Sequence, residues 1–122
     1  MNMCKMVDYG NGNYVADIKL RHIRNISEQA KKTKNISRIM LFGSSLEERC
    51  TDKSDIDIAV FGVKTKGVYL DSKEFTDFKN ALFSFDWNQD YDVLYFKETD
   101  RSEDSIIADI NHGVEIYRRN SG

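Results

Sequence analysis

The apolar residues of this chain repeat in two ways, at helical spacing in some stretches and as short runs in others. Residues 17–34 have helical spacing, because apolar side chains recur three or four positions apart, as at Ile23 and Ile26. Residues 36–42 are instead a mostly apolar run of strand length, which Gly43 ends. These two stretches predict an amphipathic helix followed by a buried strand.

Two more runs of strand length, residues 55–61 and 91–96, predict further strands. Between them lies a second apolar stripe at helical spacing, made of Phe75, Phe78, Leu82 and Phe85. Asp71 and Glu74 have the spacing of an N-cap residue and its N3 partner. We therefore expect a second helix that is capped by Asp71 and buries its aromatic stripe in the core.

Weaker signals predict the remaining elements. Residues 44–49 are long enough for one helical turn, with Ser44 as its cap. Residues 100–113 begin with the same acidic capping pattern and predict a helix that ends near Gly113. Residues 114–117 then predict a short last strand.

The polar residues 1–16 are expected to form an N-terminal arm or a hairpin. Residues 10–13 predict a turn, across which residues 5–9 can pair with residues 13–15. Residues 17–122 are expected to form a single domain, because a chain of 122 residues has little room for a second one. The order of elements predicts an α/β fold of the α+β kind, with a small mixed β-sheet and helices packed on one side.

Composition narrows the class of protein. The chain is 40% hydrophobic and 31% charged, which is typical of soluble globular proteins. No apolar run reaches the roughly 20 residues of a membrane span, and the first residues lack the apolar core of a signal peptide. We therefore expect no membrane contact. Cys4 and Cys50 make no disulfide framework, so we expect two free thiols and a reducing cytoplasm.

The formal net charge of −2 is unevenly distributed. Residues 1–40 carry eight Lys and Arg against three Asp and Glu, whereas the rest of the chain carries ten against seventeen. Most of the positive side chains belong to the first predicted helix: Lys19, Arg21, Arg24, Lys31, Lys32 and Lys34. We expect a solvated helix face that includes His22, and a phosphate-rich or acidic partner is the alternative. The overall balance argues against a dedicated nucleic-acid binder.

The residues with the clearest chemistry lie at the end of the first predicted strand and at the start of the second. Asp55 and Asp57 stand two apart, so a strand would direct both carboxylates to one face, roughly 6.5 Å apart. Such a pair repels unless a cation lies between them, and carboxylate oxygens suit Mg²⁺. Gly43 and Ser44 stand where a strand gives way to a turn, whose N–H groups and hydroxyl can hold a phosphate.

Asp92 adds a third carboxylate at the start of the strand that follows the second helix. If that strand neighbours the one carrying Asp55 and Asp57, the three side chains can converge. Carboxylates in this arrangement can hold two divalent ions roughly 3.5–4 Å apart. A phosphate-binding turn beside such a site predicts nucleotide chemistry.

These motifs carry a family resemblance. Leu41-Phe42-Gly43-Ser44, ten further residues and then Asp55-Ile56-Asp57 resemble the signature of the polymerase-beta-type nucleotidyltransferase superfamily. The short length and Tyr91-Asp92-Val93-Leu94 resemble its minimal nucleotidyltransferase (MNT) members, which are typically antitoxins paired with HEPN-domain ribonuclease toxins. The resemblance covers residues 36–117 and implies the nucleotidyltransferase fold.

The resemblance also implies a role for each candidate residue. Gly43 and Ser44 are similar to the turn that binds the nucleotide phosphates. Asp55 and Asp57 are similar to its catalytic metal ligands, which also bind the nucleotide, and Asp92 to the third carboxylate. The family implies two Mg²⁺ ions, a nucleoside triphosphate that is usually ATP, and transfer of AMP to a hydroxyl. In the antitoxins that hydroxyl belongs to a tyrosine of the toxin.

One departure from the family pattern opens other hypotheses. The family often has Arg-Gly where this chain has Glu47-Glu48, with Arg49 one position late. Acidic residues beside a triphosphate site weaken its electrostatics. The alternatives are a catalytically weak binding module that neutralises a partner by contact, or transfer to a small molecule such as an antibiotic with a helical partner completing the site. The nucleotide base, the acceptor and homo-oligomer formation are left open.

Overall fold

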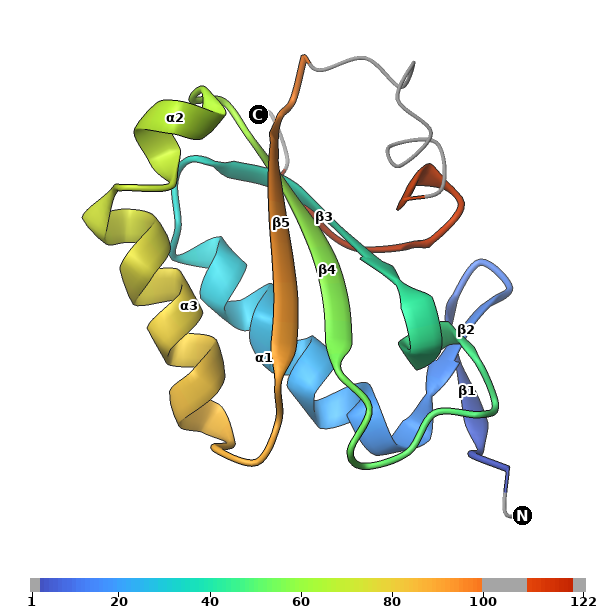
Figure 1. Ribbon diagram of the computed structural model, residues 1–122. Helices are drawn as coiled ribbons and strands as arrows, with labels where there is room; N and C mark the ends of the chain where they lie inside the picture. The colour runs from blue at the N-terminus through green and yellow to red at the C-terminus, as the bar shows by residue number, and fades with distance from the viewer. Residues whose placement is uncertain (1–2, 100–109, 120–122) are drawn as a thin grey trace.

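The computed structural model describes residues 3–99 and 110–119 (Figure 1). Its centre is a four-stranded sheet in the order β5-β4-β3-β6. The strands are β3 (Ile36–Phe42), β4 (Ile56–Gly62), β5 (Tyr91–Lys97) and β6 (Val114–Arg118). β4 and β5 are parallel, whereas β3 is antiparallel to both of its neighbours, β4 and β6. The expected mixed sheet is therefore confirmed.

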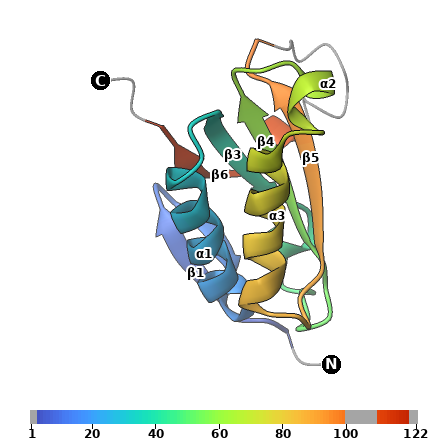
Figure 2. The ribbon, with the colours of Figure 1, turned by 90° about the vertical axis from the view of Figure 1, so that its left-hand side faces the viewer.

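Two helices, α1 (Leu20–Lys31) and α3 (Lys73–Phe85), lie side by side on one face of the sheet (Figures 1 and 2). A single 3-10 turn, Asp17–Lys19, leads into α1, and the short α2 (Lys66–Tyr69) precedes α3. The main core forms between this helical layer and alternate residues of the strands. From β4 it takes Ile56, Ile58 and Val60, all fully buried. The side chains between them point to the other face, because strand residues alternate.

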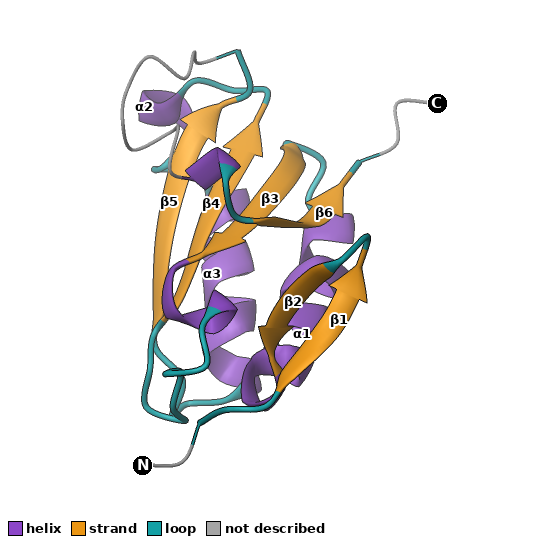
Figure 3. Ribbon diagram, turned by 90° about the vertical axis from the view of Figure 1, so that its right-hand side faces the viewer, coloured by secondary structure: helices purple, strands orange, loops and turns teal. Residues whose placement is uncertain are grey.

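The N-terminal residues form a hairpin, one of the two alternatives expected for them. β1 (Met6–Gly10) pairs antiparallel with β2 (Asn13–Ala16) in a sheet of its own, alongside α1 (Figures 2 and 3). The turn between them uses positive φ angles at Gly10, Asn11 and Gly12, which glycine and asparagine adopt most readily. Apolar side chains of the hairpin, led by the fully buried Val15, join the main core.

The face of the sheet opposite α1 and α3 carries a second, smaller core. Met40, Ala59, Phe61 and Ile110 are buried there together, and the rings of Phe61 and Phe96 stack with centroids 5.5 Å apart. Ile110 comes from the end of the predicted helix 100–113, of which residues 100–109 lie outside the described residues. Asp57 and Asp92 lie on this second face too, by the alternation of β4 and β5.

Two of the predicted caps, at Asp71 and Ser44, are wrong, and the third lies among residues 100–109, outside the described residues. Ser72, and not Asp71, is the N-cap of α3, because its hydroxyl accepts a hydrogen bond from the Phe75 amide at 3.2 Å. Glu74 accepts instead from the backbone amide of Asn35 at 3.0 Å, which ties α3 to the chain before β3. The turn after β3 is a 3-10 helix, Gly43–Leu46, without a side-chain cap.

Across residues 3–99 and 110–119, no helix has the length and apolar character needed to cross a bilayer. Cys4 and Cys50 are both free. Burial raises the pKa of the Cys50 thiol, which keeps it protonated and unreactive at neutral pH.

Candidate active site

The parallel pairing of β4 with β5 brings two of the predicted carboxylates together. Asp57 stands opposite Asp92 in the register, so their backbones are one strand spacing apart, about 4.8 Å. Asp55 lies just before β4 and shares the parity of Asp57. All three residues therefore sit where β4 and β5 begin, and Asp55 and Asp92 are exposed to solvent.

The negative charges of these three carboxylates favour the binding of a cation. Partial burial raises the pKa of the Asp57 carboxyl, and the charges of Asp92 and Asp55 raise it further. No basic side chain in the described part of the chain forms an ion pair with any of the three. Uncompensated carboxylate oxygens are the donors that Mg²⁺ prefers, so the donor set fits this ion. Within residues 3–99 and 110–119, however, no three acidic, His or Cys side chains are already gathered around a metal position.

Gly43 forms the backbone turn against which Asp57 rests. Its φ angle is +75°, a conformation that residues with a side chain rarely adopt. A Cβ atom at this position would lie 2.2 Å from Asp57 Oδ2. Glycine is therefore required twice here, for the left-handed turn and for the close approach of the carboxylate. The Ser44 hydroxyl follows in the turn and donates a long hydrogen bond of 3.5 Å to the carbonyl of Asp55.

The acidic departure from the family pattern is partly neutralised within its own loop. Arg49 Nε donates to Glu47 Oε2 at 2.5 Å, and this hydrogen bond lowers the pKa of the Glu47 carboxyl. The pair is exposed, so its contribution to stability is small. The ion pair nevertheless holds the positive charge of Arg49 next to Glu47, and Glu47 occupies the position at which the family often has arginine.

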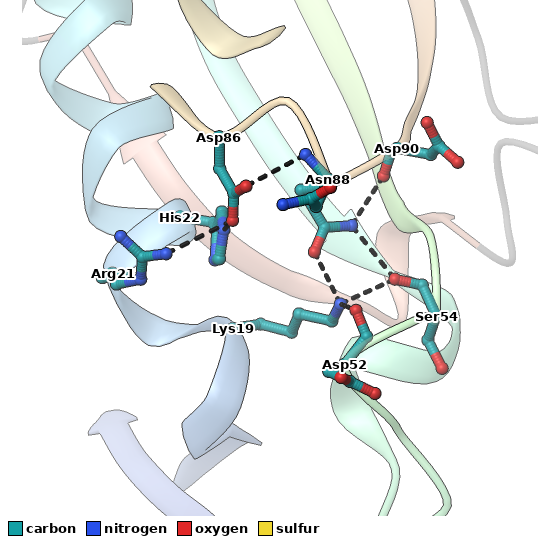
Figure 4. A network of polar contacts seen from close by, with 9 residues as sticks. Lys19, Arg21, His22, Asp52, Ser54, Asp86, Asn88 and Asp90 are labelled. Atoms are coloured by element: carbon teal, nitrogen blue, oxygen red, sulfur yellow. Dashed lines mark hydrogen bonds and ion pairs between the residues drawn. The ribbon is translucent and has the colours of Figure 1, made fainter. Parts of the chain in front are cut away.

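Two residues of the predicted solvated helix face are buried, and for them the prediction is wrong. Lys19 is 1% exposed and His22 is 5% exposed, whereas the other basic residues of that set are exposed as expected. Lys19 Nζ donates to Gln89 Oε1 at 2.6 Å and to the carbonyls of Ser54 and Asp52, and His22 Nε2 lies 2.8 Å from Asp86 Oδ2 (Figure 4). The partners are 33 to 70 positions away in sequence, so no local pattern could reveal them.

Three solved structures are similar to this chain. A complex of tri-AMPylated Shewanella oneidensis HEPN toxin with MNT antitoxin matches with a TM-score of 0.52 and 22% identity, over 83% of this chain and 73% of that one. The toxin-antitoxin pair MntA-HpeT, in a variant with two aspartates two positions apart replaced by glutamate, matches with a TM-score of 0.54 and 21% identity, over 80% and 73%. A Sulfolobus solfataricus protein assigned as a nucleotidyltransferase matches with a TM-score of 0.50 and 18% identity, over 87% and 88%. At these identities the likeness shows the fold.

Sequence comparison identifies the family directly. No curated protein matches the chain significantly. The family model described as "Polymerase beta, Nucleotidyltransferase" matches residues 24–122, which is most of the chain and includes the Gly43 turn and all three aspartates. The protein therefore belongs to the polymerase beta nucleotidyltransferase family.

Proposed function

We propose that this protein transfers AMP from ATP to a hydroxyl of a partner protein, and that it is an antitoxin acting on a helical HEPN-type toxin. The observation that carries the proposal is the pairing of Asp57 with Asp92 beside the Gly43 turn, where no basic side chain of the described residues forms an ion pair with either carboxylate. The relatives support the partner, because one is an MNT antitoxin in complex with a tri-AMPylated HEPN toxin and another is a toxin-antitoxin pair. A reducing cytoplasm, in which both cysteines stay free, is the compartment we propose.

Each residue of the site has a proposed task. The turn at Gly43 and Ser44 presents N–H groups and a hydroxyl to the phosphates. Asp55 and Asp57, with Asp92 on the acceptor side, would hold Mg²⁺, which when bound neutralises the triphosphate and the leaving pyrophosphate. Asp92 would accept the proton of the acceptor hydroxyl. The oxygen of that hydroxyl forms a bond to the α-phosphorus as the bond from this phosphorus to pyrophosphate breaks.

ATP is expected to stabilise the protein only in the presence of Mg²⁺, because the carboxylates of Asp55 and Asp57 otherwise repel the triphosphate. With ATP at a hundredfold excess over its Kd, the free energy of unfolding should rise by about 2.7 kcal/mol. Thermal denaturation with Mg²⁺, and again with a chelator, measures this effect as a shift in Tm. Equal shifts in both conditions would mean that the carboxylates are not metal ligands.

Asp92→Asn is expected to reduce AMP transfer by roughly a hundredfold, the range for loss of general-base help. Its effect on ATP affinity should be much smaller, because Gly43, Ser44, Asp55 and Asp57 hold the nucleotide. Transfer is measured with α-labelled ATP and binding by calorimetry.

Asp90→Asn is the matched control for this prediction. Asp90 precedes β5 and is exposed, and its backbone carbonyl, which the substitution retains, accepts from the Ile56 amide at 3.0 Å. The change should therefore affect neither transfer nor binding. An essential Asp90 with a dispensable Asp92 would contradict the register that pairs Asp57 with Asp92.

A binding module that neutralises the partner by contact is the second candidate. The acidic pair Glu47-Glu48 favours it, as does the absence, within the described residues, of three side chains already gathered around a metal position. Transfer and neutralisation must therefore be measured separately, in the wild type and in a variant that is folded but unable to transfer.

A further inference from the structure

The buried ammonium group of Lys19 joins three parts of the chain. Lys19 lies at the start of α1. Its Nζ donates to Gln89 Oε1 at 2.6 Å, to the Ser54 carbonyl at 2.7 Å and to the Asp52 carbonyl at 3.2 Å (Figure 4). Three acceptors match the three N–H groups of an ammonium, so the buried charge is fully hydrogen-bonded. Such an arrangement is needed, because a buried charge without partners is strongly destabilising.

Gln89 extends the same network between two loops. Its Nε2 donates to the Ser54 carbonyl at 3.0 Å and to the Asp90 carbonyl at 2.7 Å, and its side chain is buried. The Asp90 carbonyl also accepts from the Ile56 amide. The loop that leads into β4 and the loop that leads into β5 are thus held together by Lys19 and Gln89.

The position of this network along the chain links it to the two strands that carry the site. Ser54 directly precedes Asp55, and Gln89 stands three residues before Asp92. Lys19 and Gln89 therefore hold the backbone where it enters the two carboxylate-bearing strands. The charge of Lys19 also interacts with that of Asp55, although its ammonium is hydrogen-bonded to backbone and amide oxygens and makes no ion pair with a site carboxylate.

We propose that Lys19 and Gln89 are positioning residues, which set the separation of Asp55 from Asp92 and thereby the affinity of the site for a divalent cation. The inference rests on the proposed function, because it concerns the same metal ligands. A purely structural network would stabilise the fold without changing the metal affinity of the folded protein. The positioning role predicts a change in that affinity, since partners that orient metal ligands typically change it by roughly 10–100-fold when removed.

Lys19→Met tests this, because methionine keeps much of the side-chain length and removes all three donors. Binding of Mn²⁺ alone, followed by electron paramagnetic resonance, should weaken by roughly tenfold or more in the folded variant. Exchange of the Ile56 amide, followed by NMR, should become faster, because that amide bonds across the two loops. Lys53→Met is the matched control. It removes the same charge from an exposed position beside Asp52 and should leave both measurements near wild type.

Gln89→Met provides a second test in case Lys19→Met does not fold. In Gln89→Met the Lys19 ammonium retains its two carbonyl acceptors, so the buried charge stays hydrogen-bonded. This variant too should weaken Mn²⁺ binding. The double variant should lose less affinity than the product of the two single losses, because the two side chains act through one network.

The outcomes separate this inference from the proposed function. Variants that are folded and bind Mn²⁺ like a binding-competent wild type overturn the positioning role. A wild-type protein that binds no Mn²⁺ overturns both the proposed metal chemistry and the effect on metal affinity. In that case, unchanged Ile56 exchange in Lys19→Met would also reject the link between the loops.

Discussion

Asp57→Asn is expected to abolish AMP transfer while leaving the protein at least as stable as the wild type. Asparagine keeps the shape of Asp57 and removes one charge from the proposed metal site. A metal contributes several kcal/mol of charge stabilisation, so transfer should fall by about a thousandfold. Stability should respond in the opposite direction, because burial and the neighbouring charges of Asp92 and Asp55 make the ionised form of Asp57 unfavourable.

The stability difference between Asp57→Asn and the wild type should depend on pH, and its direction follows from the pKa of Asp57. The pKa of Asp57 is raised in the folded protein, so its ionisation reduces stability as the pH rises through that raised pKa. Asp57→Asn lacks this loss. The difference in Tm between variant and wild type should therefore be near zero at acidic pH and positive at neutral pH. A variant that is clearly less stable at neutral pH would contradict this electrostatic account of Asp57.

The same variant distinguishes an enzyme from a binding module. Label transfer from α-labelled ATP measures catalysis, and growth on co-expression with the HEPN-type partner measures neutralisation. Loss of both is expected of an enzyme that works by modification. Neutralisation that persists without transfer would favour contact alone, and near wild-type transfer would reject the assigned metal ligands.

The strands and the positions of the candidate carboxylates on them could be predicted because their signals are local. The apolar run 36–42 ends at Gly43, and the alternation around Asp57 is visible in a few adjacent residues. The structure confirms these strands to within about one residue and pairs Asp57 with Asp92, as expected if β4 and β5 are neighbours. Parallel pairing of strands joined by a helical segment is the common arrangement, and the structure supplies the adjacency of β4 and β5 that the local patterns left open.

The predictions that are wrong about burial concern side chains whose partners are distant in sequence. A lysine at a helix start is ordinarily solvated, and only the folded chain brings Gln89 to Lys19, 70 positions away. The same holds for His22, which was assigned to the surface and instead contacts Asp86. The misplaced cap of α3 has a different cause. Asp71 and Ser72 are both good cap residues, and the tertiary contact of Glu74 with Asn35 shows that the apparent capping box was coincidental.

Gly43→Ala is expected to reduce AMP transfer by roughly a hundredfold and stability by about 1 kcal/mol, through two separable effects. The positive φ angle strains any residue with a Cβ atom. In addition, that Cβ would occupy the place of Asp57 Oδ2, so the carboxylate must rotate away from the turn. A shift of about 1 Å in a catalytic group can reduce rates by this much.

Gly12→Ala separates the two effects, because Gly12 has nearly the same φ angle, +77°, with nothing within 4 Å of a Cβ atom. It should lose a similar amount of stability in thermal or denaturant unfolding and retain wild-type transfer. Gly43→Ala should in addition weaken Mg²⁺-dependent ATP binding, since the phosphates and the displaced Asp57 share the turn. If both alanine variants transfer AMP at the wild-type rate, the close contact between Gly43 and Asp57 has no part in catalysis, and the phosphate-binding turn must lie elsewhere. If both lose transfer in proportion to their stability, the Gly43 effect is one of folding alone.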